Sequence, residues 1–199
     1  MYFIKSLAVV LVFTLINCTV KTSSPSTPPT ETGVGSSSPA TTTAVPTADP
    51  QPAAMQGMLE THNAYRSEVG VPPLQWSDKL AQVASEWATE LQRRGCKMEH
   101  RPHSGQWDSP YGENIYWSKG MARTPTHVAE NWADEKASFD YEHANYSNFT
   151  SNGKVVGHYT QMVWRQTTHV GCAMRKCGDA EIWVCNYEPA GNWMGQRPY

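Results

Sequence analysis

Gly157-His-Tyr-Thr-Gln-Met-Val-Trp164 sets a histidine, a hydroxyl and an amide among large apolar residues. Twenty residues further along, Val184-Cys-Asn-Tyr-Glu-Pro-Ala-Gly-Asn-Trp193 shows a similar mixture. Neither a helical nor a strand period places polar groups so densely between apolar ones. We interpret these two segments as the wall of a site, around which the rest of the domain is organised.

The second segment belongs to a predicted β-hairpin. Residues 170–175 and 181–187 are predicted strands, and Gly178-Asp179 between them suits a two-residue turn. In the register that this turn sets, Cys172 lies directly opposite Cys185. Opposed residues of neighbouring strands lie about 4.5–5.5 Å apart, within reach of a disulfide. The sequence therefore predicts a Cys172–Cys185 bridge.

The chain has five cysteines, and four remain when Cys18 near the N-terminus is set aside. An even number of cysteines in an exported protein favours two disulfides, which leaves Cys96 to pair with Cys177. This second bridge would close a long loop and stabilise the fold by about 4 kcal/mol. A zinc site on the cysteines is the alternative, although the chain has no C-x-x-C pair.

The N-terminal segment predicts export. An apolar run over residues 7–16 is too short to span a bilayer and suits a secretory signal over residues 1–18. Cys18 is either the lipidated first residue of a membrane-tethered lipoprotein or a residue removed with the signal. Residues 19–53 are rich in Ser, Thr and Pro and predict a flexible linker. The folded domain is then expected to cover residues 54–199.

The charge pattern argues against nucleic acid as a partner. The formal net charge is −2 with a sequence pI near 6.4. No basic run is present, and the electrostatic footprint of a nucleic-acid-binding protein is therefore missing.

Apolar spacing predicts two helices in the first half of the domain. Apolar and aromatic residues recur every three or four positions over 55–69, and Gly70 ends this pattern. A second helix is expected from a cap at Ser77 or Asp78 to Gly95. A short strand is expected from Gly112.

A third predicted helix, starting at Thr124-Pro125 or Thr126, distinguishes between two glutamates. At 100° per residue from Val128, Glu135 falls within 20° of the apolar stripe and Glu130 falls on the opposite face. A carboxylate in an apolar stripe needs a hydrogen-bond or charge partner, because an unpaired buried charge is very costly. Histidines are the natural candidates for that partner.

Four segments together resemble the signatures of the CAP superfamily, which comprises cysteine-rich secretory proteins, antigen 5 and plant pathogenesis-related proteins of group one. They are His62-Asn-Ala-Tyr-Arg66, Gly112-Glu-Asn-Ile115, Gly157–Trp164 and Val184–Trp193. The resemblance covers about residues 55–199 and implies a single α+β domain, a three-layer α–β–α sandwich with an antiparallel sheet. It agrees with both predicted disulfides. The third bridge of the family has no counterpart here, so we expect the 141–157 loop to be more mobile than in relatives.

The resemblance also implies a cleft with two histidines and two glutamates, which correspond to His103, Glu113, Glu135 and His158. Neutral imidazoles of His103 and His158 would form an open, weak site for zinc or another divalent cation. We expect Glu113 and Glu135 to orient the two imidazoles. The alternative is a His–Glu hydrogen-bond network that only holds the shape of the cleft. His100, in the same loop as His103, is left unassigned.

Three classes of function remain open at this point. The first is binding or interaction outside the cell or on its surface, with an unknown protein or lipid partner and a monomeric chain. The second is sterol or fatty-acid binding, because Phe139, Tyr141 and Tyr146 resemble the aromatic loop of lipid-binding relatives. The third is metal-dependent hydrolysis by a His–Glu pair. The chain has neither His-Glu-x-x-His nor Gly-x-Ser-x-Gly, so we expect a binding protein and not an enzyme.

Overall fold

The predicted hairpin forms the centre of the sheet. In the computed structural model, which describes residues 48–199, β5 (His169–Cys177) pairs antiparallel with β6 (Ala180–Glu188). Cys172 lies opposite Cys185 in this pair, and the two residues form a disulfide. The predicted register is therefore confirmed, and each strand is longer than the sequence indicated.

Two further strands complete the sheet in the order β1-β5-β6-β2. β2 (Gly112–Lys119) pairs antiparallel with β6 along its full length. β1 (Gln75–Trp76) pairs with β5 in parallel, so the sheet is mixed and not purely antiparallel as expected. A two-residue strand carries no readable alternation, which is why the sequence did not indicate β1.

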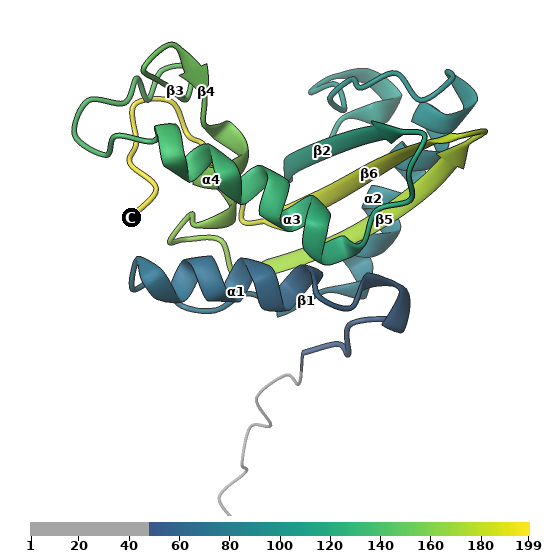
Figure 1. The fold of residues 1–199 in the computed structure, drawn as a ribbon, viewed down its shortest axis with the longest axis horizontal. Helices are drawn as coiled ribbons and strands as arrows, with labels where there is room; N and C mark the ends of the chain where they lie inside the picture. Colours follow the sequence, from purple (N-terminus) through teal and green to yellow (C-terminus); the bar gives the residue numbers. More distant parts are fainter. Residues whose placement is uncertain (1–47) are drawn as a thin grey trace, which may run out of the picture. The chain divides into compact units, whose positions relative to one another are not determined.

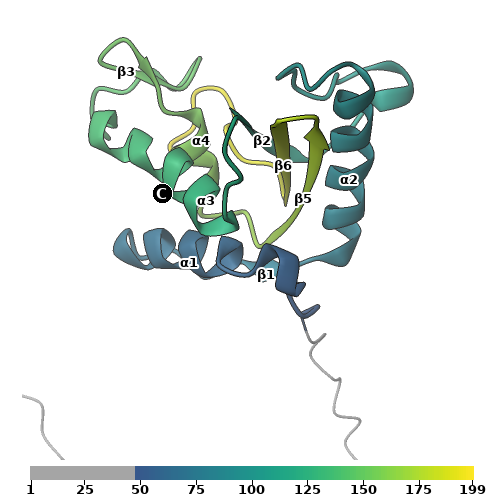
Figure 2. The same cartoon turned by 45° about the vertical axis from the view of Figure 1, so that its right-hand side comes forward.

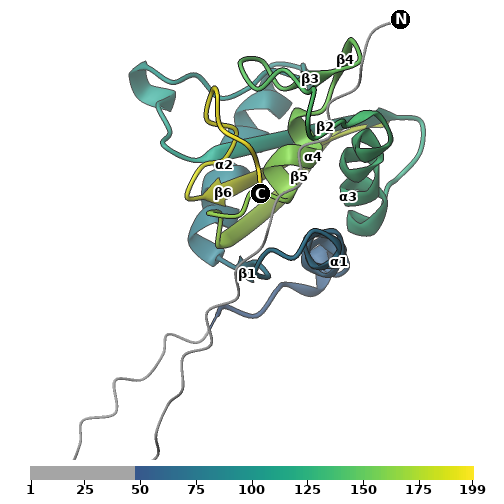
Figure 3. The same cartoon turned by 90° about the vertical axis from the view of Figure 1, so that its left-hand side faces the viewer.

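The helices cover both faces of this sheet and make the three layers that were expected. α2 (Asp78–Arg93) lies on one face, against β5 and β6. α1 (Met58–Glu68), α3 (Pro125–Ala133) and α4 (Gly157–Met162) lie on the other side of the sheet (Figure 1). Figures 2 and 3 show α1 and α3 together on the side away from α2.

Side-chain alternation along β6 explains why both faces are covered. Ile182 and Val184 pack in a buried cluster with residues of α2, whereas Trp183, Cys185 and Tyr187 pack in a second cluster with residues of α1 and α3. Successive strand residues point to opposite faces, so a strand buried throughout needs a helical layer on each side. All eight residues from Ala180 to Tyr187 are buried.

Polar side chains set the start of two helices at the predicted positions. Ser77 caps α2 by accepting a hydrogen bond from the backbone N–H of Leu80. Thr124 caps α3 by accepting from the N–H of His127. α1 starts at Met58 and not near Met55, because Gly57 before it has a left-handed backbone with φ of 96° that no helix continues through.

The chain from the end of α3 to α4 was the least predictable part. α3 ends at Ala133 and is followed by a 3-10 turn, Asp134–Ser138, which carries Glu135. Short strands β3 (Thr150–Ser151) and β4 (Lys154–Val155) pair in the segment that was expected to be a loop. The segment that begins at Gly157, for which hydrophobic periodicity did not distinguish a helix from a strand, forms α4.

Aromatic side chains hold the 139–149 loop, which contains no cysteine. The Phe139 ring lies about 5.5–6.4 Å from the rings of Tyr141, Tyr146, Tyr159 and Tyr199. The Tyr141 hydroxyl also donates to the carbonyl of Tyr199. The aromatic residues that resemble a lipid-binding loop therefore pack on the domain itself.

The last residues of the expected linker contact the domain. Asp49 accepts a hydrogen bond from the N–H of Asp78, and Gln51 accepts one from the N–H of Leu59. The predicted signal over residues 1–18 and the lipidation of Cys18 lie outside the described residues. None of the helices within residues 48–199 combines the length and apolar character needed to cross a membrane.

Candidate functional site

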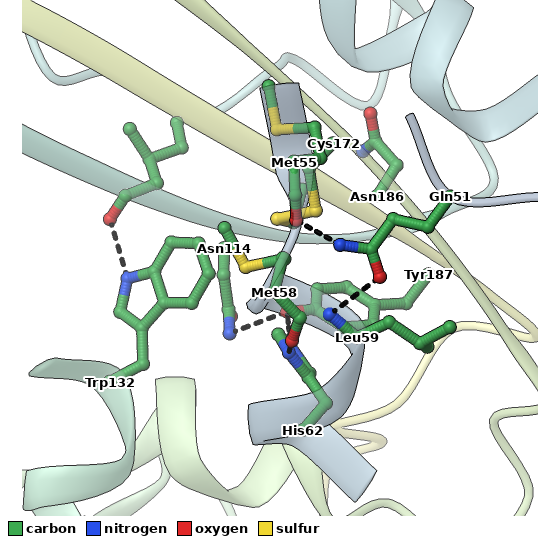
Figure 4. Close-up of a disulfide and its surroundings, with 12 residues drawn as sticks. Gln51, Met55, Met58, Leu59, His62, Asn114, Trp132, Cys172, Asn186 and Tyr187 are labelled. Carbon is green, nitrogen blue, oxygen red and sulfur yellow. Dashed lines mark hydrogen bonds between the residues drawn. A yellow bond between two sulfur atoms is a disulfide. The ribbon is translucent and has the colours of Figure 1, made fainter. Parts of the chain in front are cut away.

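A buried hydrogen-bond chain connects the four segments that resemble the CAP signatures. Figure 4 shows its His62, Tyr187 and Asn114 side chains. His62 Nδ1 lies 2.7 Å from the carbonyl of Met58, and His62 Nε2 lies 2.8 Å from the Tyr187 hydroxyl. A carbonyl only accepts, so Nδ1 carries the hydrogen and the Tyr187 hydroxyl donates to Nε2. Asn114 then donates one amide hydrogen to Tyr187 and the other to the carbonyl of His158, each over 3.1 Å.

This chain is neutral at physiological pH. Burial lowers the pKa of His62 to about 4, and burial raises the pKa of Tyr187 above its usual range. The neutral network holds the backbone of His158 in place and connects it to α1 and β6.

Arg66 fixes the chain that follows α4. Its guanidinium is buried and donates to four backbone carbonyls, at distances of 2.7–2.9 Å. These carbonyls belong to Pro72, Met162, Trp164 and Thr167. Burial lowers the pKa of Arg66 to about 10, so the group remains charged and satisfies several carbonyls at the end of a short helix.

Glu135 contacts both the side chain and the backbone of His158. Glu135 Oε1 lies 2.6 Å from His158 Nδ1, and Oε2 accepts from the backbone N–H groups of His158 and Tyr159. A carboxylate only accepts, so His158 Nδ1 carries the hydrogen of this contact, and the tautomer that this contact favours leaves a lone pair on Nε2. The imidazole also stacks on Trp132, with 6.2 Å between ring centroids.

Glu113 pairs with His100 and not with His103. Glu113 Oε1 lies 2.8 Å from His100 Nδ1 and accepts from the backbone N–H of Arg101. The N–H of Arg101 anchors this part of the loop to the carboxylate. His103 lies beyond it, with Nδ1 3.4 Å from the carbonyl of Ser109.

A cavity of about 470 Å³ lies between the 100–113 loop and the segment after β6. We call it the His100 cavity. Its lining includes His100, Arg101, Glu113, Asn186, Asn192 and Trp193. His103 and Gln161 also line it, whereas Glu135 and His158 are not among its lining residues.

The structure therefore brings the four predicted residues together in two places. His103 and Glu113 lie in the His100 cavity, with His100 as the histidine that sequence reasoning left unassigned. Glu135 and His158 form a separate pair, connected to β2 through the Asn114 side chain. Within residues 48–199, no group of three or more His, Cys, Asp or Glu side chains is placed to hold a metal ion.

Two close approaches build the wall of the cavity. Gln161 Oε1 accepts from the N–H of Gly191, and Asn192 Nδ2 donates to the carbonyl of Gly157. A Cβ atom at Gly112 would lie 2.2 Å from the Gln161 amide oxygen, and one at Gly191 would lie 2.7 Å from its nitrogen. The two polar-rich segments of the sequence are thus joined side by side, as a site wall requires.

Comparison with known proteins agrees with this arrangement. A sequence profile of the CAP family, described as the cysteine-rich secretory protein family, matches residues 59–187. The pathogenesis-related protein PR-1 of Medicago truncatula is 42% identical over 143 residues, which cover 71% of this chain and 76% of that protein. The pathogenesis-related protein PRMS of Zea mays is 44% identical over 148 residues, which cover 72% and 81%.

Solved structures show the same fold. The crystal structure of NaASP2 with Zn²⁺ superposes with a TM-score of 0.62 at 26% identity, over 75% of this chain and 90% of that one. Venom allergen-like protein 4 of Schistosoma mansoni superposes with a TM-score of 0.54 at 27% identity, over 74% and 94%. The joined segments and both disulfides agree with the CAP family assignment. The matched profile shows that the chain belongs to the CAP family of cysteine-rich secretory proteins.

Proposed function

We propose that this protein acts outside the cell as a binding protein whose histidines take a divalent cation. The observation that carries the proposal is the pair of carboxylate–histidine contacts, Glu135–His158 and Glu113–His100. In each pair the carboxylate holds Nδ1, which leaves Nε2 of the neutral imidazole as a metal ligand. Surface tethering through Cys18 stays part of the proposal.

The extracellular location follows from the cysteine chemistry and the family. Cys96–Cys177 and Cys172–Cys185 are both bonded, and such bridges persist in oxidising compartments. The family that the chain belongs to is described as secretory.

The donor set suits a weakly held transition-metal ion. Imidazole nitrogens are common ligands of zinc, and an open site is completed by water or carboxylate. His158 is one candidate ligand, and it lies outside the cavity that holds His100 and His103. The proposal therefore requires a histidine of the 100–103 loop, either His100 or the originally expected His103, to move towards His158 when the ion binds. When bound, the ion would supply a Lewis-acidic centre for an oxygen ligand. The related structure of NaASP2 contains Zn²⁺, which supports this choice of ion.

Calorimetric titration of the full chain with zinc tests the proposal. We expect saturable binding that is lost in His158→Ala and in one of His100→Ala and His103→Ala. Glu135→Gln should weaken binding by about 10–100-fold, because the carboxylate sets the tautomer of His158. The matched control is His143→Ala, since His143 is exposed and pairs with Asp140.

Each outcome of the titration has a definite meaning. Loss of binding in His100→Ala would identify His100 and His158, the two histidines that contact carboxylates, as the ligands. Loss of binding in His103→Ala would identify His103 and His158, the two histidines expected from the sequence. An absence of binding heat in the unmodified chain, or binding kept by all three single histidine variants, would overturn the proposal.

A further inference from the structure

We propose that the His100 cavity binds carbohydrate, with the Trp193 indole as a stacking surface and Glu113 and Asn186 as acceptors for sugar hydroxyls. The inference rests on the proposed function only for an extracellular binding role. It names the class of ligand and needs no metal ion. Three features of the cavity carry it.

The first feature is a fixed, exposed indole. Trp193 lines the cavity and is 56% exposed, although most tryptophans are largely buried. Its Nε1–H donates to the carbonyl of Ala190 over 3.0 Å, which holds the ring in one orientation. The cavity wall therefore offers a flat apolar face without an ordering cost on binding.

The second feature is a pair of acceptor oxygens that lack donors. Glu113 and Asn186 are register partners in β2 and β6, so their side chains project from the same face of the sheet. Glu113 Oε2 and Asn186 Oδ1 are buried and have no hydrogen-bond partner within the described part of the chain. The other polar atoms are already engaged: Glu113 Oε1 with His100 and Arg101, and Asn186 Nδ2 with the carbonyl of Gly112.

An unpaired buried acceptor is destabilising, and a donor from a ligand would remove this cost after a small side-chain shift. A hydroxyl supplies that donor, and a further hydroxyl can donate to the Nε2 atom of His100, since its Nδ1 is held by Glu113. A sugar ring carries hydroxyls on its edge and C–H groups on its face, and so matches both the oxygens and the indole.

The third feature is the paired charge of the cavity, which favours an uncharged organic ligand. The Glu113 carboxylate and the Arg101 guanidinium both line the cavity, so a large organic ion of either sign meets a like charge. A lipid tail would leave the acceptor oxygens unpaired. The cavity volume of about 470 Å³ lies within the range of ~300–1,000 Å³ for small-molecule sites.

The experiment begins with an oligosaccharide array, probed with the full chain. The array carries oligomers of glucose, N-acetylglucosamine, galactose, mannose and uronic acids. Soluble forms of the sugars that bind are then titrated by saturation-transfer NMR. We expect Trp193→Ala to weaken binding by about tenfold or more and Trp193→Phe to keep part of it. Trp117→Ala is the matched control, because Trp117 is 42% exposed and lies outside the cavity lining.

The outcomes separate this inference from the proposed function. Binding of no sugar on the array, or equal binding by Trp193→Ala and Trp117→Ala, would overturn the carbohydrate site. A zinc titration of Trp193→Ala should match that of the unmodified chain, because Trp193 supplies no metal ligand. Sugar binding without zinc binding would refute the cation and leave the carbohydrate site standing.

Discussion

The Tyr187 hydroxyl lies 2.8 Å from Nε2 of His62, although 125 residues separate them in the sequence. Both side chains are fully buried, and Asn114 supplies the hydrogen that Tyr187 accepts. This contact joins α1 to the last strand of the sheet and, through Asn114, to the backbone of His158. The network therefore connects three of the segments that resemble the CAP signatures to His158, the candidate metal ligand in the fourth.

We expect Tyr187→Phe to lower the free energy of unfolding by about 1–3 kcal/mol. The substitution keeps the ring but leaves His62 Nε2 and one amide hydrogen of Asn114 buried without a partner. Urea denaturation followed by circular dichroism measures the change. Tyr116→Phe is the control, because the Tyr116 hydroxyl bonds to none of the described residues and its ring packs edge-on to His127. Equal stability of the two variants would contradict the network.

We expect stability to fall as the pH is lowered from about 6.5 towards 4, in part through His62. Burial lowers the pKa of His62 from 6.5 to about 4, so the unfolded chain binds the proton more readily in this window. The neutral form therefore stabilises the fold above pH 6.5, and this contribution of roughly 3 kcal/mol is lost on acidification. Urea denaturation across this pH range should show a shallower slope for His62→Gln than for the unmodified chain. His127→Gln should keep the full slope, and the idea fails if the two variants behave alike.

We expect Gly171→Ala to destabilise the domain by about 1–3 kcal/mol or more. A Cβ atom there would lie 2.2 Å from the backbone nitrogen of Ala81 and 2.4 Å from the carbonyl oxygen of Ser77. These are backbone atoms in and next to the first turn of α2, so relief requires α2 to shift from β5. Thermal unfolding measures the effect. Gly157→Ala is the contrast, because its nearest atoms lie 3.7 Å away, and a comparable loss in both variants would show that the close approach is not the cause.

The hairpin and the helix caps were predictable because local chemistry determines them. Gly178-Asp179 sets a register in which only one pairing of Cys172 is available, and the structure has that pairing. Ser77 and Thr124 satisfy the N–H groups at the start of their helices, which a local pattern reveals. β1 was not predictable, because its two residues pair with a strand almost a hundred positions away.

Site residues were predictable where the chain has helical periodicity, and they were not predictable in an irregular loop. The helical wheel selected Glu135 although α3 ends at Ala133, since the following 3-10 turn keeps the side chain on the same side. The 96–111 loop has no hydrophobic periodicity, so the choice of His103 over His100 rested only on the resemblance to the CAP superfamily. The deciding contact is the backbone N–H of Arg101 on Glu113, which depends on how the loop is folded.

The two disulfides should stabilise the domain unequally, and we expect the Cys96–Cys177 bridge to contribute more. It spans 81 residues, whereas Cys172–Cys185 spans 13. In the loop-entropy account the longer loop contributes about 4.5 kcal/mol and the shorter about 3 kcal/mol. Urea denaturation under oxidising conditions compares two double variants, Cys96→Ala/Cys177→Ala and Cys172→Ala/Cys185→Ala.

The longer bridge also fixes the start of the loop that carries His100, so its removal should weaken zinc binding as well as stability. Removal of the shorter bridge should reduce stability but leave zinc affinity nearly unchanged, because both strands remain paired along their length. A larger loss of stability in the Cys172→Ala/Cys185→Ala variant would show that packing in the buried cluster around Cys172, and not loop closure, dominates the contribution of the disulfides.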